Sequence, residues 1–223
     1  MKKSVLILMC LFLAGMTFTL KSQNMTQEEK NSYALGVNIG ENFKSQGIEV
    51  NNLEAFKQGF MDVMNGKNKL TMEEMQVCYE DIQRQIDAKQ NATIEIEKQK
   101  GKAFLAENKK RAGVKETASG LQYEAIVMGA GPKPEATDRV KVHYTGKTLD
   151  GQVFDSSVER GEPIVFGLNQ VIRGWTEGLQ LMPVGSKFML YIPSDLAYGD
   201  RGQGSIKPGQ TLVFEVELFE IQK

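Results

Sequence analysis

The hydrophobic residues of this chain follow two different periods, and the change between them divides the sequence near its middle. In the first half apolar residues recur at helical spacing, as Phe56 and Phe60 do. From Gly120 onward they alternate with polar residues, as around Val140 and Val142. Such alternation is typical of antiparallel strands with one buried face. The sequence therefore predicts two regions of different fold class.

The region from residue 25 to residue 112 is predicted to be all helical. Glycines at Gly47 and Gly66 are expected to end the first two helices, because glycine tolerates the left-handed conformation found there. The helix starts are indicated by a capping residue with a glutamate three positions later, at Thr26/Glu29, Asn51/Glu54 and Thr71/Glu74.

The third helix is unusually long and polar. No proline interrupts the sequence from Met72 to about Arg111, and residues 83–102 are mostly charged or amide residues. A helix that is polar nearly all round is typical of a connector exposed to solvent. We expect Gly101 to be a weak point of this helix and a candidate hinge.

Two short helices and the beginning of a third cannot bury their apolar faces well alone. Met61, Met64, Met72 and Met75 add further flexible apolar surface. We therefore expect the helical region to form a homodimer in which each copy covers the other. A small monomeric helical cap folded on the second domain is the alternative.

Residues 113–223 are predicted to form a separate α+β domain. Alternating segments predict strands over residues 121–128, 140–145, 187–193 and 211–220. The segment Ile172–Leu181, which contains Trp175, is the one short helix expected. A twisted antiparallel sheet packed on this helix accounts for the pattern.

The first residues, 1–22, are predicted to be an export signal. Lys2 and Lys3 precede an apolar run from Val5 to Leu20, which is short for a membrane span. Export to the periplasm is expected, with the outer membrane or cell surface as alternatives. An uncleaved membrane anchor, or a lipoprotein acceptor at Cys10, also stays open.

Several classes of chemistry find no support in the sequence. Lysine and arginine, 27 in all, nearly balance 28 acidic residues, so no basic surface for nucleic acid is expected. The single histidine, His143, is predicted to point away from the core, as a surface residue rather than a general base. No cysteine and histidine cluster has the spacing of metal ligands. We therefore expect no cofactor and no metal.

Aromatic residues of the second domain carry the one candidate site. Trp175 is the only tryptophan, Tyr198 lies in a glycine-rich loop between polar residues, and Asp155 follows an aromatic residue directly. Such a mixture of aromatic side chains with a few polar groups is the usual composition of a binding pocket. A plain aromatic core is the alternative, and it is the expected role of Phe166 and Phe188.

Several motifs of this region resemble those of FKBP-type peptidyl-prolyl isomerases, in the order and spacing of that family. They are residues 140–146 (VKVHYTG), 149–157 (LDGQVFDSS), 171–175 (VIRGW), 182–185 (MPVG), 197–199 (AYG) and 211–218 (TLVFEVEL). The helical half is similar to the dimerisation domain of periplasmic and surface FKBPs of the FkpA and macrophage-infectivity-potentiator type. Residues 33–36 (YALG) and 56–60 (FKQGF) carry this second resemblance.

The resemblance implies an isomerase that acts on X–Pro bonds of unfolded or partly folded proteins and binds macrolides of the FK506 type. It implies that Trp175 lies beneath the proline ring, that the Ile172 backbone N–H and the Tyr198 hydroxyl hold substrate carbonyls, and that Asp155 is the acidic edge. Ile164 and Ile206 are the less regular rim positions, because an aromatic residue is usual at the first and the loop around the second is short. The full set of implied site residues is Tyr144, Phe154, Asp155, Val171, Ile172, Trp175, Tyr198 and Phe214.

Two other functions stay open from the sequence. One is a chaperone that binds proline-containing chains with little catalytic turnover. The other is a structural dimer with a degenerate pocket, which the retention of the pocket aromatics and Asp155 disfavours.

Overall fold

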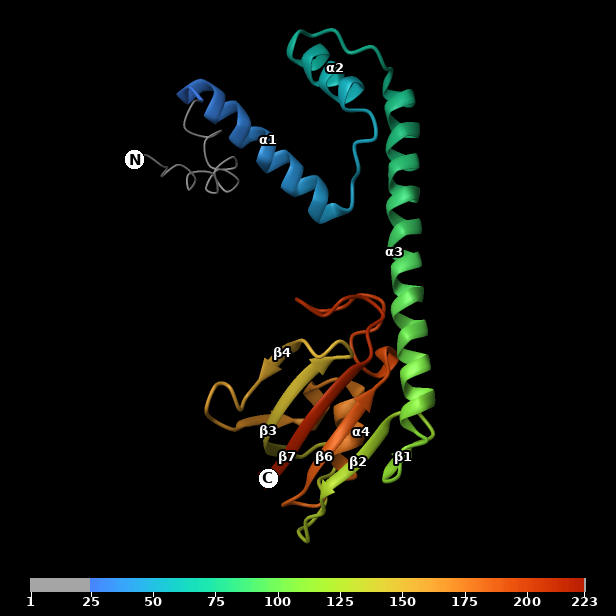
Figure 1. The fold of residues 1–223 in the computed structure, drawn as a ribbon, viewed down its shortest axis with the longest axis vertical. Helices are drawn as coiled ribbons and strands as arrows, with labels where there is room; N and C mark the ends of the chain where they lie inside the picture. The colour runs from blue at the N-terminus through green and yellow to red at the C-terminus, as the bar shows by residue number, and fades with distance from the viewer. Residues whose placement is uncertain (1–24, 223) are drawn as a thin grey trace, which may run out of the picture. The chain divides into compact units, whose positions relative to one another are not determined.

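The computed structural model describes residues 25–222, which form a helical unit and a unit built on a β-sheet (Figure 1). The predicted export signal lies outside the described residues. Packing divides the chain after Ile86, so that the second unit begins at Asp87, inside the third helix. The helices of the chain are α1 (Gln27–Gln46), α2 (Leu53–Met64), α3 (Met72–Asn108) and α4 (Arg173–Gln180).

Capping residues explain where the first three helices begin. At α1 the Thr26 side chain accepts a hydrogen bond from the Glu29 N–H, and the Glu29 carboxylate accepts one from the Thr26 N–H at 2.7 Å. Thr71 and Glu74 form the same pair before α3. These two capping boxes confirm the prediction. The predicted cap at Asn51 is wrong by one residue, because the side chain of the next residue, Asn52, accepts the hydrogen bond from the Ala55 N–H at the start of α2.

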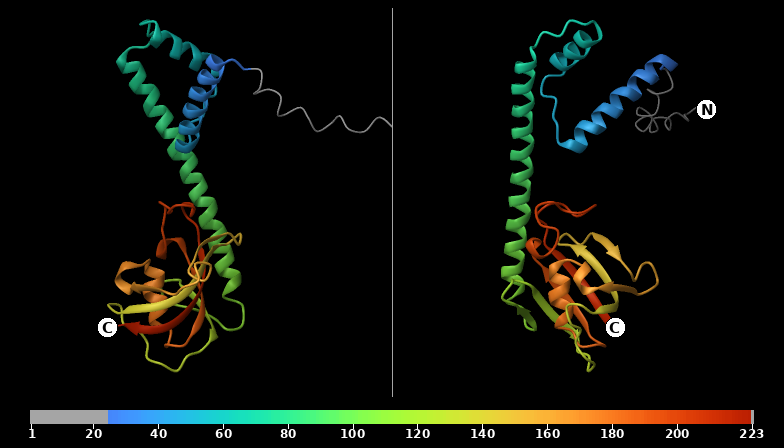
Figure 2. Two further views of the ribbon diagram at one scale, coloured as in Figure 1. Left: turned by 90° about the vertical axis from the view of Figure 1, so that its left-hand side faces the viewer. Right: turned by 180° about the vertical axis from the view of Figure 1, so that it is seen from behind.

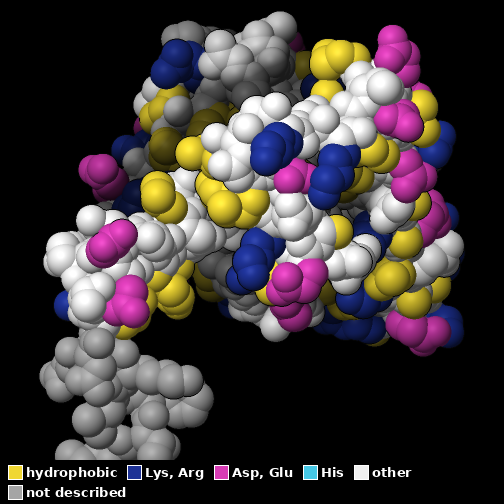
Figure 3. All heavy atoms as spheres, turned by 90° about the horizontal axis from the view of Figure 1, so that it is seen from above, with side chains coloured by type: hydrophobic (Ala, Val, Ile, Leu, Met, Phe, Trp, Pro, Cys, Tyr) yellow, Lys and Arg dark blue, Asp and Glu magenta, His cyan; other side chains and the backbone are white. Residues whose placement is uncertain are grey.

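The helical unit has little core of its own. Neither α1 nor α2 contains a buried residue. Phe43 and Phe56 meet edge to face with ring centroids 5.7 Å apart, which joins α1 to α2. Yellow hydrophobic side chains stand at the surface in the view of Figure 3. The large exposed ones of this unit include Tyr33, Leu35, Leu53, Phe60, Met61, Val63, Met64, Met72, Val77 and Tyr79.

One antiparallel sheet forms the framework of the second unit. Its order is β1-β2-β6-β7-β3-β4, and β5 pairs with the other part of β3. The strands are β1 (Val114–Glu116), β2 (Gln122–Val127), β3 (Arg139–Thr148), β4 (Val153–Ser156), β5 (Ile164–Gly167), β6 (Lys187–Ile192) and β7 (Leu212–Gln222). The longer strands confirm the predicted alternation. Asp155 lies within β4.

Helix α4 covers one face of this sheet, as Figure 2 shows from behind. Two glycines allow the close approach. A β-carbon at Gly178 would lie 2.9 Å from Leu190, and one at Gly174 would overlap Ile192. The helix also contributes the buried Trp175 and Leu179 to a core shared with β3, β6 and β7. The predicted arrangement of a twisted sheet packed on one short helix is confirmed.

The last part of α3 packs against the sheet unit rather than passing through solvent. Asn108, 3% exposed, donates a hydrogen bond to the fully buried Gln122 at 2.9 Å. The ring of Phe104 lies 5.9 Å from that of Tyr191. Gly101 is buried in an unbroken helix, so the structure gives it a packing role in place of the expected hinge. The connector prediction overlooked this contact because the buried groups are mostly small or polar.

Within residues 25–222, no helix is long and apolar enough to cross a membrane.

Candidate active site

A cavity of about 390 Å³ opens between α4 and the concave side of the sheet. Its lining comes from β3, β4, β5 and β7, from α4 with the segment before it, and from the loop after β6, which are far apart in sequence. All of the site residues expected from the motifs take part. The lining residues are Tyr144, Phe154, Asp155, Phe166, Gln170, Val171, Ile172, Trp175, Tyr198 and Phe214.

Trp175 lies at the centre of the aromatic lining. It is 3% exposed, and its ring meets those of Tyr144, Phe166 and Phe214 edge to face, with centroids 5.0, 5.5 and 5.3 Å away. Edge-to-face packing of this kind fixes ring orientation and stabilises each pair by about 0.5–1.5 kcal/mol. The indole Nε1 is buried without a hydrogen-bond partner among the described residues, which is unusual in a plain core.

A glycine of β3 allows two walls of the cavity to approach. A β-carbon at Gly146 would lie 2.6 Å from the ring of Phe154 and 2.7 Å from that of Phe214. These two rings meet edge to face with centroids 5.5 Å apart. Any side chain at this position would push the rings toward the cavity, so the glycine helps to set its width.

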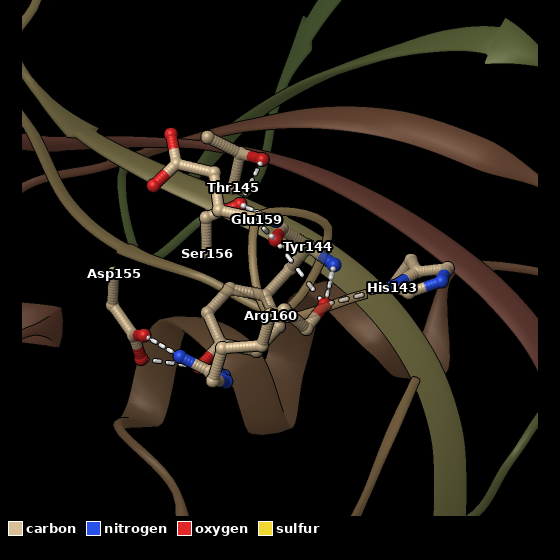
Figure 4. A network of polar contacts seen from close by, with 8 residues as sticks. His143, Tyr144, Thr145, Asp155, Ser156, Glu159 and Arg160 are labelled. Carbon is tan, nitrogen blue, oxygen red and sulfur yellow. Dashed lines mark hydrogen bonds and ion pairs between the residues drawn. The ribbon is translucent and has the colours of Figure 1, made fainter. Parts of the chain in front are cut away.

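The polar edge of the cavity is a network of three side chains, which Figure 4 shows. The Tyr144 hydroxyl donates to the Asp155 carboxylate, and the Arg160 guanidinium donates to both, with 3.1 Å between its Nη2 and the Tyr144 oxygen. Arg160 also lies over the Tyr144 ring, 5.7 Å from its centroid. Arg160 is not among the residues predicted from the sequence, where its only signal is its place in the turn that follows Asp155.

The network fixes the charge state of its members. Partial burial acts to raise the pKa of Asp155, but the hydrogen bonds from Tyr144 and Arg160 outweigh it and lower that pKa below its usual value. Burial, together with the bond to Asp155, raises the pKa of Tyr144. At neutral pH the edge therefore presents a carboxylate held by two donors.

His143 lies next to this network but faces away from the cavity. Its Nδ1 is 3.0 Å from the Ser157 hydroxyl, which accepts a hydrogen bond from the Tyr144 N–H at 2.8 Å. The imidazole also meets Phe219 edge to face. His143 is half-buried on the far side of β3, so the prediction that it points outward holds, although it is less exposed than a free surface residue.

Two more of the expected site residues, Ile172 and Tyr198, border the cavity from the segments that adjoin α4 and β6. Ile172 is the N-cap of α4, and Tyr198 borders the cavity from the loop after β6. Burial, and to a lesser extent the negative charge of Asp155, raise the pKa of Tyr198, so its hydroxyl stays a donor.

The two expected rim residues do not line the cavity. Ile164 lies on β5, where it pairs with Val142 of β3. Ile206 is part of the core and is only 6% exposed. The loop around Ile206 turns that side chain inward, which its sequence did not reveal. Phe166, expected to be core only, does line the cavity.

A second hollow of about 470 Å³ lies between α3 and the loop before β2. It is the larger of the two, but its lining includes Lys102, Lys109, Arg173, Glu116 and Asp195 and no aromatic residue. The aromatic cavity is therefore the candidate site. Among residues 25–222 no group of acidic, cysteine and histidine side chains could hold a metal ion.

Comparison with known proteins identifies the family. Residues 131–219 match the family model of the FKBP-type peptidyl-prolyl cis-trans isomerase, and residues 28–125 match that of the domain amino terminal to it. The chain is 47% identical over 214 residues to the FKBP-type peptidyl-prolyl cis-trans isomerase FkpA of Aeromonas hydrophila, covering 91% of this chain and 80% of the relative. It is also 47% identical over 198 residues to the FKBP-type 22 kDa peptidyl-prolyl cis-trans isomerase of Escherichia coli, covering 88% and 96%.

A solved structure agrees over both units. The crystal structure of FkpA from Escherichia coli superposes with a TM-score of 0.72 at 35% identity, covering 88% of this chain and 97% of that one. Fold, sequence and aromatic cavity thus define an isomerase of X–Pro peptide bonds. The chain belongs to the FKBP family, as one of its members with an amino-terminal helical domain.

Proposed function

We propose that the aromatic cavity is where this isomerase binds the prolyl ring of its substrate, and that it accelerates X–Pro isomerisation during the folding of exported proteins. The observation that carries the proposal is the meeting of Trp175, Phe154 and Phe214 around one cavity that also contains a few polar side chains, among them Asp155 and Tyr198. Residues 113–223 are the proposed isomerase domain. Residues 25–112 are the proposed dimerisation domain, and residues 1–22 are the proposed export signal.

The cavity suits the reaction because it removes the X–Pro amide from water, which stabilises the planar form of the amide. Rotation about an X–Pro bond requires this resonance to be broken, at a barrier of about 18–20 kcal/mol. Water stabilises the polar planar amide more than the twisted one. A prolyl ring that lies on Trp175 and leaves water therefore has a smaller barrier, with no acid or base required.

Hydrogen bonds at the edge would add to this effect. We assign the Ile172 N–H and the Tyr198 hydroxyl as donors to the substrate carbonyls, and Asp155 as the acidic edge of the cavity. Donors fixed before the substrate arrives need no reorganisation during the reaction. Arg160 and Tyr144 hold the Asp155 carboxylate in place, so the edge is rigid.

The assignment predicts that the full chain accelerates isomerisation of a proline peptide in a protease-coupled assay, and that an FK506-type macrolide inhibits it. Both ligands would fill the same apolar cavity, so inhibition is expected to be competitive. A chain that binds the macrolide but gives no acceleration at micromolar concentration would instead favour a binding chaperone. Acceleration that the macrolide leaves unchanged would contradict the placement of the site.

The exposed apolar residues of α1 and α2 support a homodimer. The solvent-exposed fractions of Phe60, Val63 and Met64 are 53, 68 and 70%, and these residues lie on α2, which has no buried residue. A second copy of the helical unit would cover them. Two joined isomerase domains could hold one unfolded client, which makes chaperone activity part of the proposal.

Phe60→Glu is therefore expected to convert the dimer into a monomer, because a charge in an apolar interface loses its hydration. Light scattering coupled to gel filtration measures the change, with Gln58→Glu, on the side of α2 opposite Phe60, as control. Peptide turnover should be unchanged, while protection of an aggregating protein should be lost. A wild-type chain that is monomeric throughout would favour the helical cap, and a Phe60→Glu chain that stays dimeric would remove this face from the interface.

Export is proposed to the periplasm, with attachment at the outer membrane or cell surface as the alternative. The apolar first residues of the sequence and its similarity to the relative named "Outer membrane protein MIP" of Legionella longbeachae support this proposal.

A further inference from the structure

The loop between β6 and β7 contacts two parts of the second unit at once. One side carries Tyr198 into the lining of the cavity. The other side lies along the last part of α3, as both Figure 1 and Figure 2 show. No residue of α3 lines the aromatic cavity, whereas this loop contacts both the helix and the cavity, so it offers a direct route by which the helix can affect the site.

An ion pair makes the first contact between α3 and the loop. Lys98 Nζ lies 2.6 Å from Asp200 Oδ1, two residues beyond Tyr198. The Lys98 side chain is 22% exposed and that of Asp200 is 57% exposed, so the pair is shielded on its lysine side; Lys100, which pairs with Glu97 on the helix itself, is 63% exposed. A partly buried pair keeps more of its strength than a fully exposed one.

Backbone contacts fix the other end of the loop. A β-carbon at Gly209 would lie 2.7 Å from the Ile94 carbonyl oxygen, so this turn rests directly on the helix. The Gly209 N–H in turn donates to the Gly199 carbonyl at 2.9 Å, which links the helix contact to the residue that follows Tyr198. The chain path from α3 to the Tyr198 backbone is therefore short and hydrogen bonded.

Gly101 makes the third contact, at the point where the loop enters β7. A β-carbon there would overlap the Thr211 hydroxyl and lie 3.2 Å from the Thr211 Cβ. Thr211 is 3% exposed and stands three residues before the cavity residue Phe214. The helix and the loop fit together only because this position has no side chain.

We propose that the last part of α3 is a positioning element of the isomerase site, in which Lys98 and Gly101 hold the loop that presents Tyr198 to the substrate. The residues act through the loop and touch no substrate. The inference rests on the proposed role of the Tyr198 hydroxyl in substrate binding. Helix α3 would then affect the rate of isomerisation, although it lies within the residues that match the domain amino terminal to the isomerase.

The test measures kcat/KM for a proline peptide with the full chain. Lys98→Gln and Asp200→Asn should each lower it by about two- to fivefold, as expected for loss of one partly exposed ion pair. The double variant should lose no more than either single one. Lys100→Gln, on the same helix, is the matched control and should keep the parental value.

Dependence on Tyr198 separates positioning from a general structural effect. Tyr198→Phe should itself lower kcat/KM, and adding Lys98→Gln to it should cause no further loss, because the pair acts through that hydroxyl. A further loss of the same size in the Tyr198→Phe background would overturn the positioning role. If Lys98→Gln keeps full activity while Tyr198→Phe does not, the positioning role fails and the site stands. If Tyr198→Phe keeps full activity, the proposed role of this tyrosine in the site fails.

The steric contact offers a second route. Gly101→Ala should lower kcat/KM by about tenfold, because it displaces the loop, and Thr211→Ala added to it should restore most of the loss by removing the overlapping hydroxyl. Gly59→Ala in α2, where a β-carbon has no neighbour within 4 Å, is the control. If Gly101→Ala lowers kcat/KM and Thr211→Ala does not restore it, the proposed contact between these two positions is contradicted.

Discussion

Trp175→Ala is expected to lower kcat/KM for proline peptides by about 100-fold, which corresponds to about 2.7 kcal/mol of lost transition-state stabilisation. The indole lines the cavity and meets three neighbouring rings. Without it water can enter beside the prolyl ring and again favour the planar amide. Affinity for an FK506-type macrolide should fall in parallel, because the same surface is lost.

Truncation of a buried tryptophan also destabilises a fold, by about 3–5 kcal/mol. Phe188→Ala is the matched control, because this ring is 1% exposed in the same core, stacks on Tyr123 and does not line the cavity. It should lose comparable stability with little loss of activity per folded molecule. Trp175→Phe, which keeps an aromatic base, should retain intermediate activity. Equal activity losses in Phe188→Ala and Trp175→Ala would mean that stability, not the cavity, explains the effect.

Gln122→Leu is expected to destabilise the second unit by about 3 kcal/mol or more. The Gln122 side chain is fully buried and makes three hydrogen bonds, to Asn108, to the Leu105 carbonyl at 2.9 Å and to Glu116 at 2.7 Å. Leucine fills a similar volume but removes the partner of the buried Asn108 amide and of the Leu105 carbonyl, whereas the exposed Glu116 keeps its ion pair with Lys109. Each buried polar group left without a partner costs about 1–3 kcal/mol.

Urea unfolding followed by tryptophan fluorescence measures this effect in the full chain. Trp175 is the only tryptophan, so the signal reports on the second unit alone. Gln99→Leu, at an exposed position of α3, is the control and should shift the midpoint little. A Gln122→Leu midpoint equal to that of the control would show that α3 contributes little to the stability of the sheet unit.

The strands, the short helix and most cavity residues could be predicted because each depends on a local pattern. Alternation identifies β3 and β7, and the family motifs contain the lining residues themselves. Arg160 could not be found this way, since its contact with Asp155 depends on the path of an irregular turn. Ile206 was misplaced for the same reason: its loop, not its residue type, decides which way it points.

The contact of α3 with the sheet unit was missed for a different physical reason. Hydrophobic periodicity detects apolar stripes, whereas this interface depends on Gly101, Asn108 and Lys98. A glycine required for close approach and a glycine that weakens a helix look the same in sequence. Only the neighbour, here Thr211, distinguishes them.

The chain divides inside α3, so the region matched by the isomerase family and the region that packs as one unit begin at different residues. The isomerase family match begins at residue 131, but the packed unit begins at Asp87. A helix that belongs by ancestry to one module has become part of the architecture of the other. Exchange of isomerase domains between relatives at residue 131 would therefore leave α3 and β2 on one side of the junction and their partners on the other, as for Phe104 with Tyr191 and Lys98 with Asp200. The workable junction for such recombination lies upstream of the buried part of α3.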